Sequence, residues 1–337
     1  MRPRRRGRLP PTKPAATDYA STMTSQSMRR TKTYLGPARD FVGYGRYAPR
    51  FRWPGDALVA VNLVLAYEEG SEYSILDGDD RNDNWGEFDL KISSTVRDLG
   101  TETHFEYGSR AGIWRLARLF DRFGVPVTVA ACARALERNP AIVGWITEHN
   151  HDILGHGLRW SEVWTMTKKD ERRELQRALA LYNQLTGTRP LGWNCRSFPS
   201  VNTRDLIMEE GGFLYYSDPC NDDVPYFVEA HNKRLLVVPY SKILNDSRFL
   251  MSPGYSNPRD FVEDCRAYID YLVEEGEEAG AKIATIAVHA RWTGQPNRAA
   301  ALRDILAYAC GKAGVCFMRR VDIAQFWLKH FRDFEAG

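Results

Sequence analysis

From residue 34 onward, short apolar runs alternate with stretches whose apolar residues recur at the 3.6-residue spacing of a helix. The run at residues 57–67 is ALVAVNLVLAY, which predicts a strand buried on both faces. Residues 108–123 have the helical spacing and predict a helix. Strand and helix alternate in this way roughly seven or eight times, which is typical of a parallel sheet covered by helices. We therefore expect one α/β domain over residues 34–337, folded as a parallel barrel.

The other predicted elements follow the same alternation. Further strands are expected at residues 125–132, 152–157, 191–195, 213–217, 235–240, 282–289 and 315–318. Further helices are expected at residues 168–185, 202–210, 258–278, 298–311 and 321–331, and one more begins at Asn139-Pro140. Residues 71–103 are rich in acids and predict a long loop after the first strand. A dinucleotide-binding sheet is the alternative, but the first strand ends in Glu68-Glu69-Gly70 without a G-x-G-x-x-G turn, and no Walker sequence occurs.

Residues 1–33 differ in charge from the rest of the chain. They hold nine Lys and Arg residues against one acid, so the overall charge of +3 leaves about −5 on the remainder. This segment has few apolar residues and is predicted to be a disordered basic tail. It has no aromatic residue beyond Tyr19, and the remainder has no basic stripe, so we expect no nucleic-acid partner. A transit-like segment, a true start at Met23 or Met28, and a plain solvated tail all stay open.

The lengths of the apolar runs and the spacing of the cysteines indicate the cellular compartment to be expected. The longest apolar run, at residues 57–66, is interrupted by Asn62. It is far shorter than a membrane-spanning helix, which needs about 20 apolar residues. Residues 1–33 also lack the apolar region of a secretory signal. The six cysteines include no C-x-x-C pair, which disfavours a disulfide framework and a cysteine zinc site. We therefore expect a cytoplasmic protein that does not associate with membranes.

Ionisable and hydrogen-bonding side chains follow the predicted strands at their carboxyl ends. These residues are Glu68, Glu69, His156, Arg196, Asp218, Tyr240 and His289. In a barrel, the carboxyl ends of the strands meet at one face, where the loops build an active site. So many reactive groups at one face are hard to explain by stability alone, which predicts an enzyme.

The acids and histidines of this set are candidate catalysts. Adjacent carboxyl groups push their pKa values apart, so Glu68 or Glu69 is a candidate general base. His156 lies between two glycines, which let a ligand approach the backbone closely. His289 ends the predicted strand at residues 282–289.

Two interpretations stay open for each of two arginines, Arg110 and Arg196. Arg196 either binds a substrate carbonyl or carboxylate through its planar fork or supports a loop. Arg110 either binds substrate or pairs with a neighbouring side chain.

A metal site on this face would need more donors than the spacing provides. A mononuclear metal site at this face would use two histidines at i and i+4, a carboxylate and an open position for water. Four residues after His156 stands Trp160, whose indole N–H cannot ligate a metal. We therefore expect no cofactor, although a weakly held divalent ion at Glu69 and His156 stays open.

Several motifs carry a resemblance to a known family. The three at the expected site are Tyr67-Glu68-Glu69-Gly70, Gly155-His156-Gly157-x-Arg159-Trp160 and Val288-His289-x-Arg291, and further runs lie at residues 40–46, 106–112, 190–193, 209–215 and 240–249. On these motifs, most of residues 36–330 resemble the polysaccharide deacetylase superfamily, and within it the uricase-associated, metal-independent allantoinase and cyclic imide hydrolase branch. The resemblance implies a distorted (β/α) barrel of the polysaccharide deacetylase type that assembles as a homo-oligomer.

The resemblance also implies roles for individual residues. The deacetylases carry an Asp-Asp pair, one base and one metal ligand, where Glu68-Glu69 lies, and two metal histidines where this chain has His156 and Trp160. They place a general-acid histidine where His289 lies. The sequence departs from the allantoinase pattern at residues 194–199, at Ala290, at Trp292 and at residues 295–297, beside the expected site.

The predicted function is hydrolysis of a non-peptide carbon–nitrogen bond that opens a small cyclic amide, imide or ureide. The predicted catalytic residues are Glu68, Glu69, His156 and His289. The predicted substrate-binding residues are Arg110, Trp160, Trp193, Arg196, Tyr240 and Arg291, of which Arg196 and Arg291 are expected to stabilise an oxyanion. The alternatives are a metal-dependent polysaccharide or peptidoglycan N-deacetylase and a non-catalytic relative that binds a metabolite.

Overall fold

The computed structural model describes residues 35–87, 93, 96–230 and 232–334. The chain divides into two units, Met1–Leu35 and Gly36–Gly337, and the elements below all belong to the second. The basic tail predicted at residues 1–33 lies outside the described residues.

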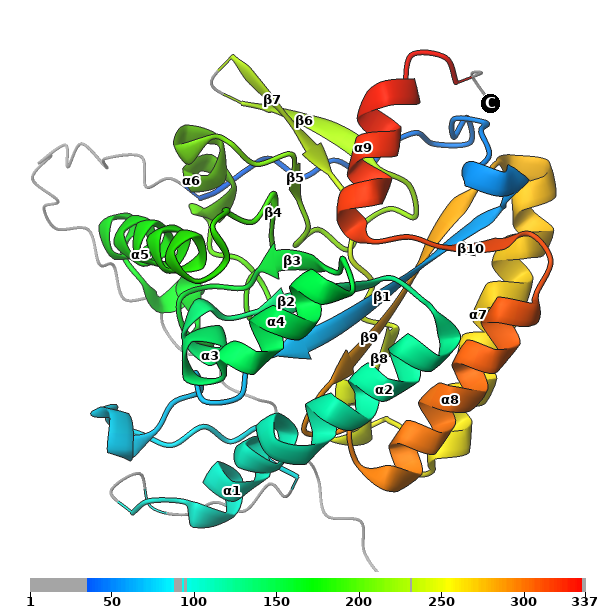
Figure 1. Ribbon diagram of the computed structural model, residues 1–337. Helices are drawn as coiled ribbons and strands as arrows, with labels where there is room; N and C mark the ends of the chain where they lie inside the picture. The colour runs from blue at the N-terminus through cyan, green and yellow to red at the C-terminus, as the bar shows by residue number, and fades with distance from the viewer. Residues whose placement is uncertain (1–34, 88–92, 94–95, 231, 335–337) are drawn as a thin grey trace, which may run out of the picture. The chain divides into compact units, whose positions relative to one another are not determined.

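The long apolar run forms an interior strand of a mostly parallel sheet (Figure 1). This strand, β1 (Val59–Tyr67), is buried along its whole length, which confirms the strand predicted at residues 57–67. It pairs in parallel with β2 (Val127–Ala131) on one side and with β9 (Lys282–His289) on the other. A strand with sheet neighbours on both edges and helices packed over the sheet has no solvated face, which explains the unbroken apolar character.

The remaining strands extend the sheet on both sides of β1. They are β3 (Asp152–Gly155), β4 (Gly192–Trp193), β5 (Tyr215–Tyr216), β6 (Tyr226–Ala230), β7 (Lys233–Val237), β8 (Leu244–Asn245) and β10 (Val315–Phe317). The order is β6-β7-β5-β4-β3-β2-β1-β9-β8, with β10 paired to the first residues of β1. The α/β prediction is confirmed, but the expectation of an all-parallel sheet was wrong at β6 and β7, which form an antiparallel hairpin. Asn232 lies in its turn with a φ of 57°, a conformation that asparagine tolerates better than most residues.

A buried arginine links segments near the two ends of this sheet. Within the described residues, β6 and β8 end the pairing path and do not pair with each other. Arg320 is fully buried and donates from Nη1 to Oγ1 of Thr285 on β9 at 3.2 Å and from Nη2 to the carbonyl of Val238, just after β7, at 2.9 Å. Its Nη1 also donates to Oδ1 of Asn62 on β1 at 2.8 Å. The arrangement resembles a distorted barrel in which side-chain hydrogen bonds replace part of the strand pairing.

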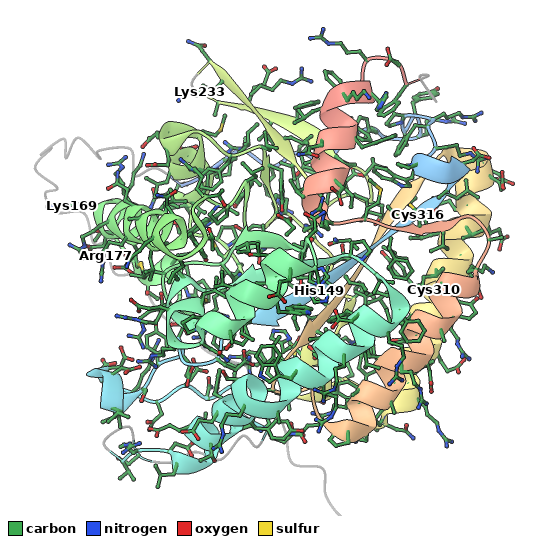
Figure 2. The ribbon with its side chains drawn as sticks, viewed as in Figure 1. His149, Lys169, Arg177, Lys233, Cys310 and Cys316 are labelled. Carbon is green, nitrogen blue, oxygen red and sulfur yellow. The ribbon has the colours of Figure 1, made fainter. Side chains whose placement is uncertain are left out.

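Helices cover the outer side of the sheet. They are α1 (Leu99–Tyr107), α2 (Ile113–Phe123), α3 (Ala133–Arg138), α4 (Pro140–Glu148), α5 (Lys168–Thr186), α6 (Thr203–Glu210), α7 (Pro258–Ala279), α8 (Pro296–Gly311) and α9 (Arg320–His330). α8 packs between α2 and α7, with α7 also against β1 and β9 (Figure 1). The exposed side chains of Lys169 and Arg177 project from α5 (Figure 2), as expected for an amphipathic helix. None of the described helices combines the length and apolar character needed to cross a membrane.

Two glycines bring the first helical segment against the end of β9. The helix predicted at residues 108–123 instead begins earlier, at α1, and passes into α2 through a π-helical turn, Gly108–Gly112. Asp98 caps α1 by accepting a hydrogen bond from the Thr101 backbone N–H at 3.0 Å, so the predicted loop ends sooner than expected. A Cβ atom at Gly112 would lie 2.0 Å from the carbonyl oxygen of Ala290, and one at Gly108 would lie 2.5 Å from Oε1 of Glu69. Only glycine permits this close approach.

Candidate active site

A cavity of about 280 Å³ opens at the carboxyl ends of the strands. Small apolar side chains of β1 and β2 form its floor: Val64, Ala66 and Ala130. Glu68 enters directly after β1, His156 directly after β3, and His289 as the last residue of β9. The structure thus brings three of the four predicted catalytic residues to one cavity, as expected for strand ends of a barrel-like sheet.

Glu68 is the centre of this group. Its side chain is almost fully buried, and its Oε1 atom lies 3.2 Å from Nε2 of His156 and 3.7 Å from Nε2 of His289. Its Oε2 atom lies 2.8 Å from Nη1 of Arg291. One carboxylate oxygen therefore faces both imidazoles while the other is held by a guanidinium.

Glu69 lies behind Glu68, away from the cavity. Its Oε1 accepts a hydrogen bond from the backbone N–H of Arg291 at 3.1 Å, and its Oε2 accepts one from the backbone N–H of Glu68 at 3.0 Å. Gly108 packs against the same side chain. Both oxygens are occupied by the main chain, so Glu69 fixes the backbone on either side of the site and does not line the cavity.

The two adjacent carboxyl groups have opposite pKa shifts. Burial would raise the pKa of Glu68, but Arg291, His289 and His156 outweigh it and hold that pKa well below the usual range. Burial raises the pKa of Glu69, Arg291 opposes the rise, and the neighbouring charge of Glu68 adds to it. The pKa values are separated as predicted, but the raised one belongs to the carboxyl group that does not face the cavity. Glu68 is consequently ionised throughout the neutral pH range.

A buried carboxylate supports His289. Nδ1 of His289 lies 2.6 Å from Oδ1 of Asp246, and Oδ2 of Asp246 accepts hydrogen bonds from the His289 backbone N–H at 2.8 Å and from Oγ1 of Thr293 at 2.6 Å. Asp246 is fully buried. Since Nδ1–H donates to Asp246, Nε2 is the ring atom directed at Glu68, and the carboxylate stabilises the protonated imidazole.

A second chain of contacts positions His156. Nδ1 of His156 lies 3.2 Å from the backbone carbonyl oxygen of Asn194, which can only accept a hydrogen bond. The Asn194 side chain donates to Oδ1 of Asp218 at 2.9 Å, and the Cys195 backbone N–H donates to the same oxygen at 2.7 Å. Both ring nitrogens of His156 therefore face oxygen acceptors, the carbonyl of Asn194 and the carboxylate of Glu68.

The predicted arginines do not reach the cavity. Arg291 is fully buried and is paired with Glu68, while Arg196 is paired with Asp83 at 2.7 Å and stacks on the Trp160 ring at 3.7 Å. Each guanidinium is engaged by a carboxylate, so neither is free to stabilise an oxyanion. Arg110 is exposed and lies 3.7 Å from Glu106 one helical turn away, which agrees with its alternative interpretation as a surface ion pair.

Of the predicted substrate-binding residues in the described part of the chain, Trp160 and Tyr240 line the cavity. Trp193 is buried beside Gly155, where its ring fills the space that a Cβ atom would need, and it lies outside the cavity lining. Two indoles that the sequence did not identify as part of the binding site, Trp85 and Trp292, also form cavity walls.

The donor set does not fit a bound metal ion. Among the residues that the structure describes, no three His, Cys, Asp or Glu side chains are arranged to hold a metal. Trp160 occupies the position of the second metal histidine of the deacetylases, and its buried Nε1–H has no acceptor. Glu69, proposed with His156 as a weak site, has both oxygens occupied by backbone N–H groups. Zinc sites normally use three or four protein ligands, which this cavity lacks.

Sequence reasoning missed Asp246, Asn194 and Trp85 as functional residues. Asp246 follows the two-residue strand β8, which has no recognisable periodicity, although the motif at residues 240–249 contains it. Asn194 lies in the segment that departs from the allantoinase pattern. Trp85 lies in the acidic segment interpreted only as an inserted loop.

Comparison with known proteins gives consistent matches. Residues 102–202 match the family model described as Polysaccharide deacetylase. A Schizosaccharomyces pombe protein whose name assigns it to the polysaccharide deacetylases is 33% identical over 309 residues, covering 86% of this chain and 96% of the relative. The crystal structure of a probable polysaccharide deacetylase from Pseudomonas aeruginosa PAO1 is 42% identical with a TM-score of 0.83, covering 86% of this chain and 98% of that chain. The crystal structure of PuuE allantoinase is 40% identical with a TM-score of 0.83, covering 88% of this chain and 98% of that chain.

These similarities extend over most of the chain and far beyond the segment matched by the family model. They agree with the mostly parallel α/β sheet. The chain belongs to the polysaccharide deacetylase family of enzymes.

Proposed function

We propose that this enzyme hydrolyses a ring carbon–nitrogen bond of a small cyclic amide, imide or ureide. The observation that carries the proposal is the position of Oε1 of Glu68, which lies between Nε2 of His156 at 3.2 Å and Nε2 of His289 at 3.7 Å in a cavity of small-molecule size. A carboxylate base and an imidazolium acid at one point can add water to a carbonyl group and protonate the departing nitrogen.

The proton route follows from these contacts. Glu68 accepts a proton from water as the oxygen attacks the ring carbonyl carbon, and His156, whose Nε2 lies 3.2 Å from Oε1 of Glu68, holds that carboxylate in position. The C–N bond breaks, and His289 donates its Nε2 proton to the leaving nitrogen. Glu68 then returns a proton to His289 across the 3.7 Å separation, so one water is consumed and both groups recover their starting states. Asp246 stabilises His289 in its protonated form.

Cavity size and one relative support a small cyclic substrate. A volume of about 280 Å³, bounded by aromatic side chains, lies just below the range of about 300–1,000 Å³ usual for small-molecule pockets, which favours a small substrate. A relative of known structure that is 40% identical over 88% of this chain carries the name allantoinase, and allantoin is a cyclic ureide.

The second candidate is a metal-dependent polysaccharide or peptidoglycan N-deacetylase. The names of the Schizosaccharomyces pombe and Pseudomonas aeruginosa relatives favour it. The donor set argues against it, because Trp160 stands where the second metal histidine is expected.

A hydrolysis screen distinguishes these candidates. The full chain is incubated with hydantoin, succinimide, dihydrouracil, allantoin and N-acetylglucosamine oligomers, and ring opening and acetate release are followed separately, with Glu68→Gln as the inactive control. We expect ring opening that Glu68→Gln abolishes. Acetate release without ring opening would support the deacetylase instead, and no turnover would support the third candidate, a non-catalytic relative.

The remaining expectations are also proposals. Six free cysteines suit a reducing compartment, so we propose a cytoplasmic location and a small-molecule substrate without nucleic-acid or membrane partners. The homo-oligomer implied by the family resemblance stays a prediction, which light scattering of the purified chain tests.

A further inference from the structure

We infer that Trp85 is a specificity-determining residue that limits the enzyme to small, flat rings. The inference rests on the proposed function and concerns which cyclic substrates that site accepts. Two features of Trp85 support it: the packing of the indole and the hydrogen bonds of the main chain.

The Trp85 indole forms a wall of the cavity together with two other indoles. It is half-buried and lies 6.4 Å from the Trp160 ring at an angle of 77° and 6.0 Å from the Trp292 ring at 47°. The Trp292 ring lies 4.2 Å from the ring of His289. The three indoles come from three separate segments and surround the space next to the catalytic groups. Aromatic faces of this kind favour a planar ring as occupant.

The Trp85 backbone is fixed on both sides of the residue. Its N–H donates to Oδ1 of Asp83 at 3.0 Å, and Asp83 is held by the buried Arg196 at 2.7 Å. Its carbonyl accepts a hydrogen bond from Nε of Arg291 at 3.2 Å, and Arg291 also binds Glu68. The Trp85 backbone therefore cannot shift away from the cavity without breaking contacts that also hold the catalytic carboxylate.

This arrangement separates two functions of one residue. The side chain of Trp85 bounds the cavity, whereas its main-chain carbonyl supports Arg291. A substitution of the side chain keeps the carbonyl, so it changes which rings fit but leaves the surroundings of Glu68 in place.

The test compares two rings that share a reacting group but differ in size, hydantoin and 5-benzylhydantoin. Trp85→Ala and Trp85→Phe are compared with Trp114→Ala, a matched control at a half-buried tryptophan of α2 that does not line the cavity. We expect Trp85→Ala to shift the ratio of kcat/KM values toward the bulky ring by about 10-fold or more, mainly through KM. Trp85→Phe is expected to shift this ratio less, and Trp114→Ala not at all. The pH dependence of kcat/KM should be the same in all four proteins.

Binding measurements keep this test independent of turnover. Calorimetry of both rings with Glu68→Gln, with and without Trp85→Ala, measures the same preference in a protein that does not react. If ring preference in binding depends on Trp85 but the unmodified enzyme turns over neither ring, the inference about Trp85 is supported and the proposed reaction is refuted. A folded Trp85→Ala protein with an unchanged preference, an equal shift in Trp114→Ala, or no binding of either ring would overturn the inference.

Discussion

Nδ1 of His289 lies 2.6 Å from Oδ1 of Asp246, and both side chains are buried. The pair directs the opposite ring atom, Nε2, toward Oε1 of Glu68 at 3.7 Å. An imidazole oriented by a carboxylate in this way gives up and regains one proton at a defined atom. Asp246 is thus a positioning residue for the acid step.

Replacing Asp246 with asparagine should lower kcat by about 10²–10⁴-fold, with a smaller effect on KM. The amide removes the negative charge that stabilises the protonated ring and permits the wrong tautomer of His289. Steady-state kinetics of Asp246→Asn and His289→Ala measure the effect, and we expect the double variant to lose little more than His289→Ala alone. A double variant whose losses multiply would show that Asp246 does not act through His289.

Glu68→Gln and Glu69→Gln should differ strongly in activity although the residues are adjacent. Glu68 faces the cavity, so its amide should lower kcat by about 10²–10⁴-fold. Glu69 binds two backbone N–H groups, so its amide should mainly destabilise the fold, by about 1–3 kcal/mol. Kinetics and thermal denaturation of both variants are compared at one pH. Similar losses of kcat in two folded proteins would refute this division of roles.

Arg291 should set the acidic limit of activity. It is the strongest of the contacts that lower the pKa of Glu68, so Arg291→Met should raise that pKa and move the acid limb of the kcat/KM profile to higher pH. Arg291→Lys keeps the charge and should move the limb less. Arg196→Met is the control, because Arg196 is a buried arginine paired with Asp83 and makes no ion pair with Glu68. An unchanged acid limb in Arg291→Met would contradict the electrostatic argument.

Glu72 should make the protein less stable as the pH rises. Burial raises its pKa to about 7, so the folded state favours the protonated form. The resulting stabilisation is complete below the unfolded pKa of about 4.5 and is lost as the pH rises through 7. Glu72→Gln keeps an acceptor for the Gly70 N–H and removes the titration, so it should raise Tm by about 4 °C at pH 8 and little at pH 5. Glu106→Gln, at an exposed surface position, is the control, and equal shifts at both pH values would reject the prediction.

The parts of the fold and site that the sequence predicted are those set by local pattern. β1 and β9 are long, wholly buried and apolar, so their ends located Glu68 and His289 correctly. His156 was located by the short strand before it and by its flanking glycines. These features depend on a few neighbouring residues, so they can be predicted from the sequence alone.

The missed features depend on contacts between distant segments. The direction of the Arg291 guanidinium toward Glu68 and the partner of Arg196, 113 residues away at Asp83, have no periodic signature. The hairpin of β6 and β7 interrupts an otherwise parallel sheet through one short turn. Side-chain pairing and turn geometry, rather than the hydrophobic pattern, determine these contacts and the strand direction in the hairpin.

In the proposed reaction, a carboxylate and two histidines open a ring without a metal ion. The most direct measurement follows ring opening and acetate release by protein exhaustively treated with a chelator, before and after zinc is added back. Trp160→His, which restores a histidine four residues after His156, serves as the control for zinc binding by calorimetry. We predict that the chelated enzyme opens the ring at its full rate and that zinc adds nothing, whereas Trp160→His binds zinc more tightly than the unmodified chain. Loss of turnover on chelation with recovery on addition of zinc would contradict the account and support the metal-dependent deacetylase.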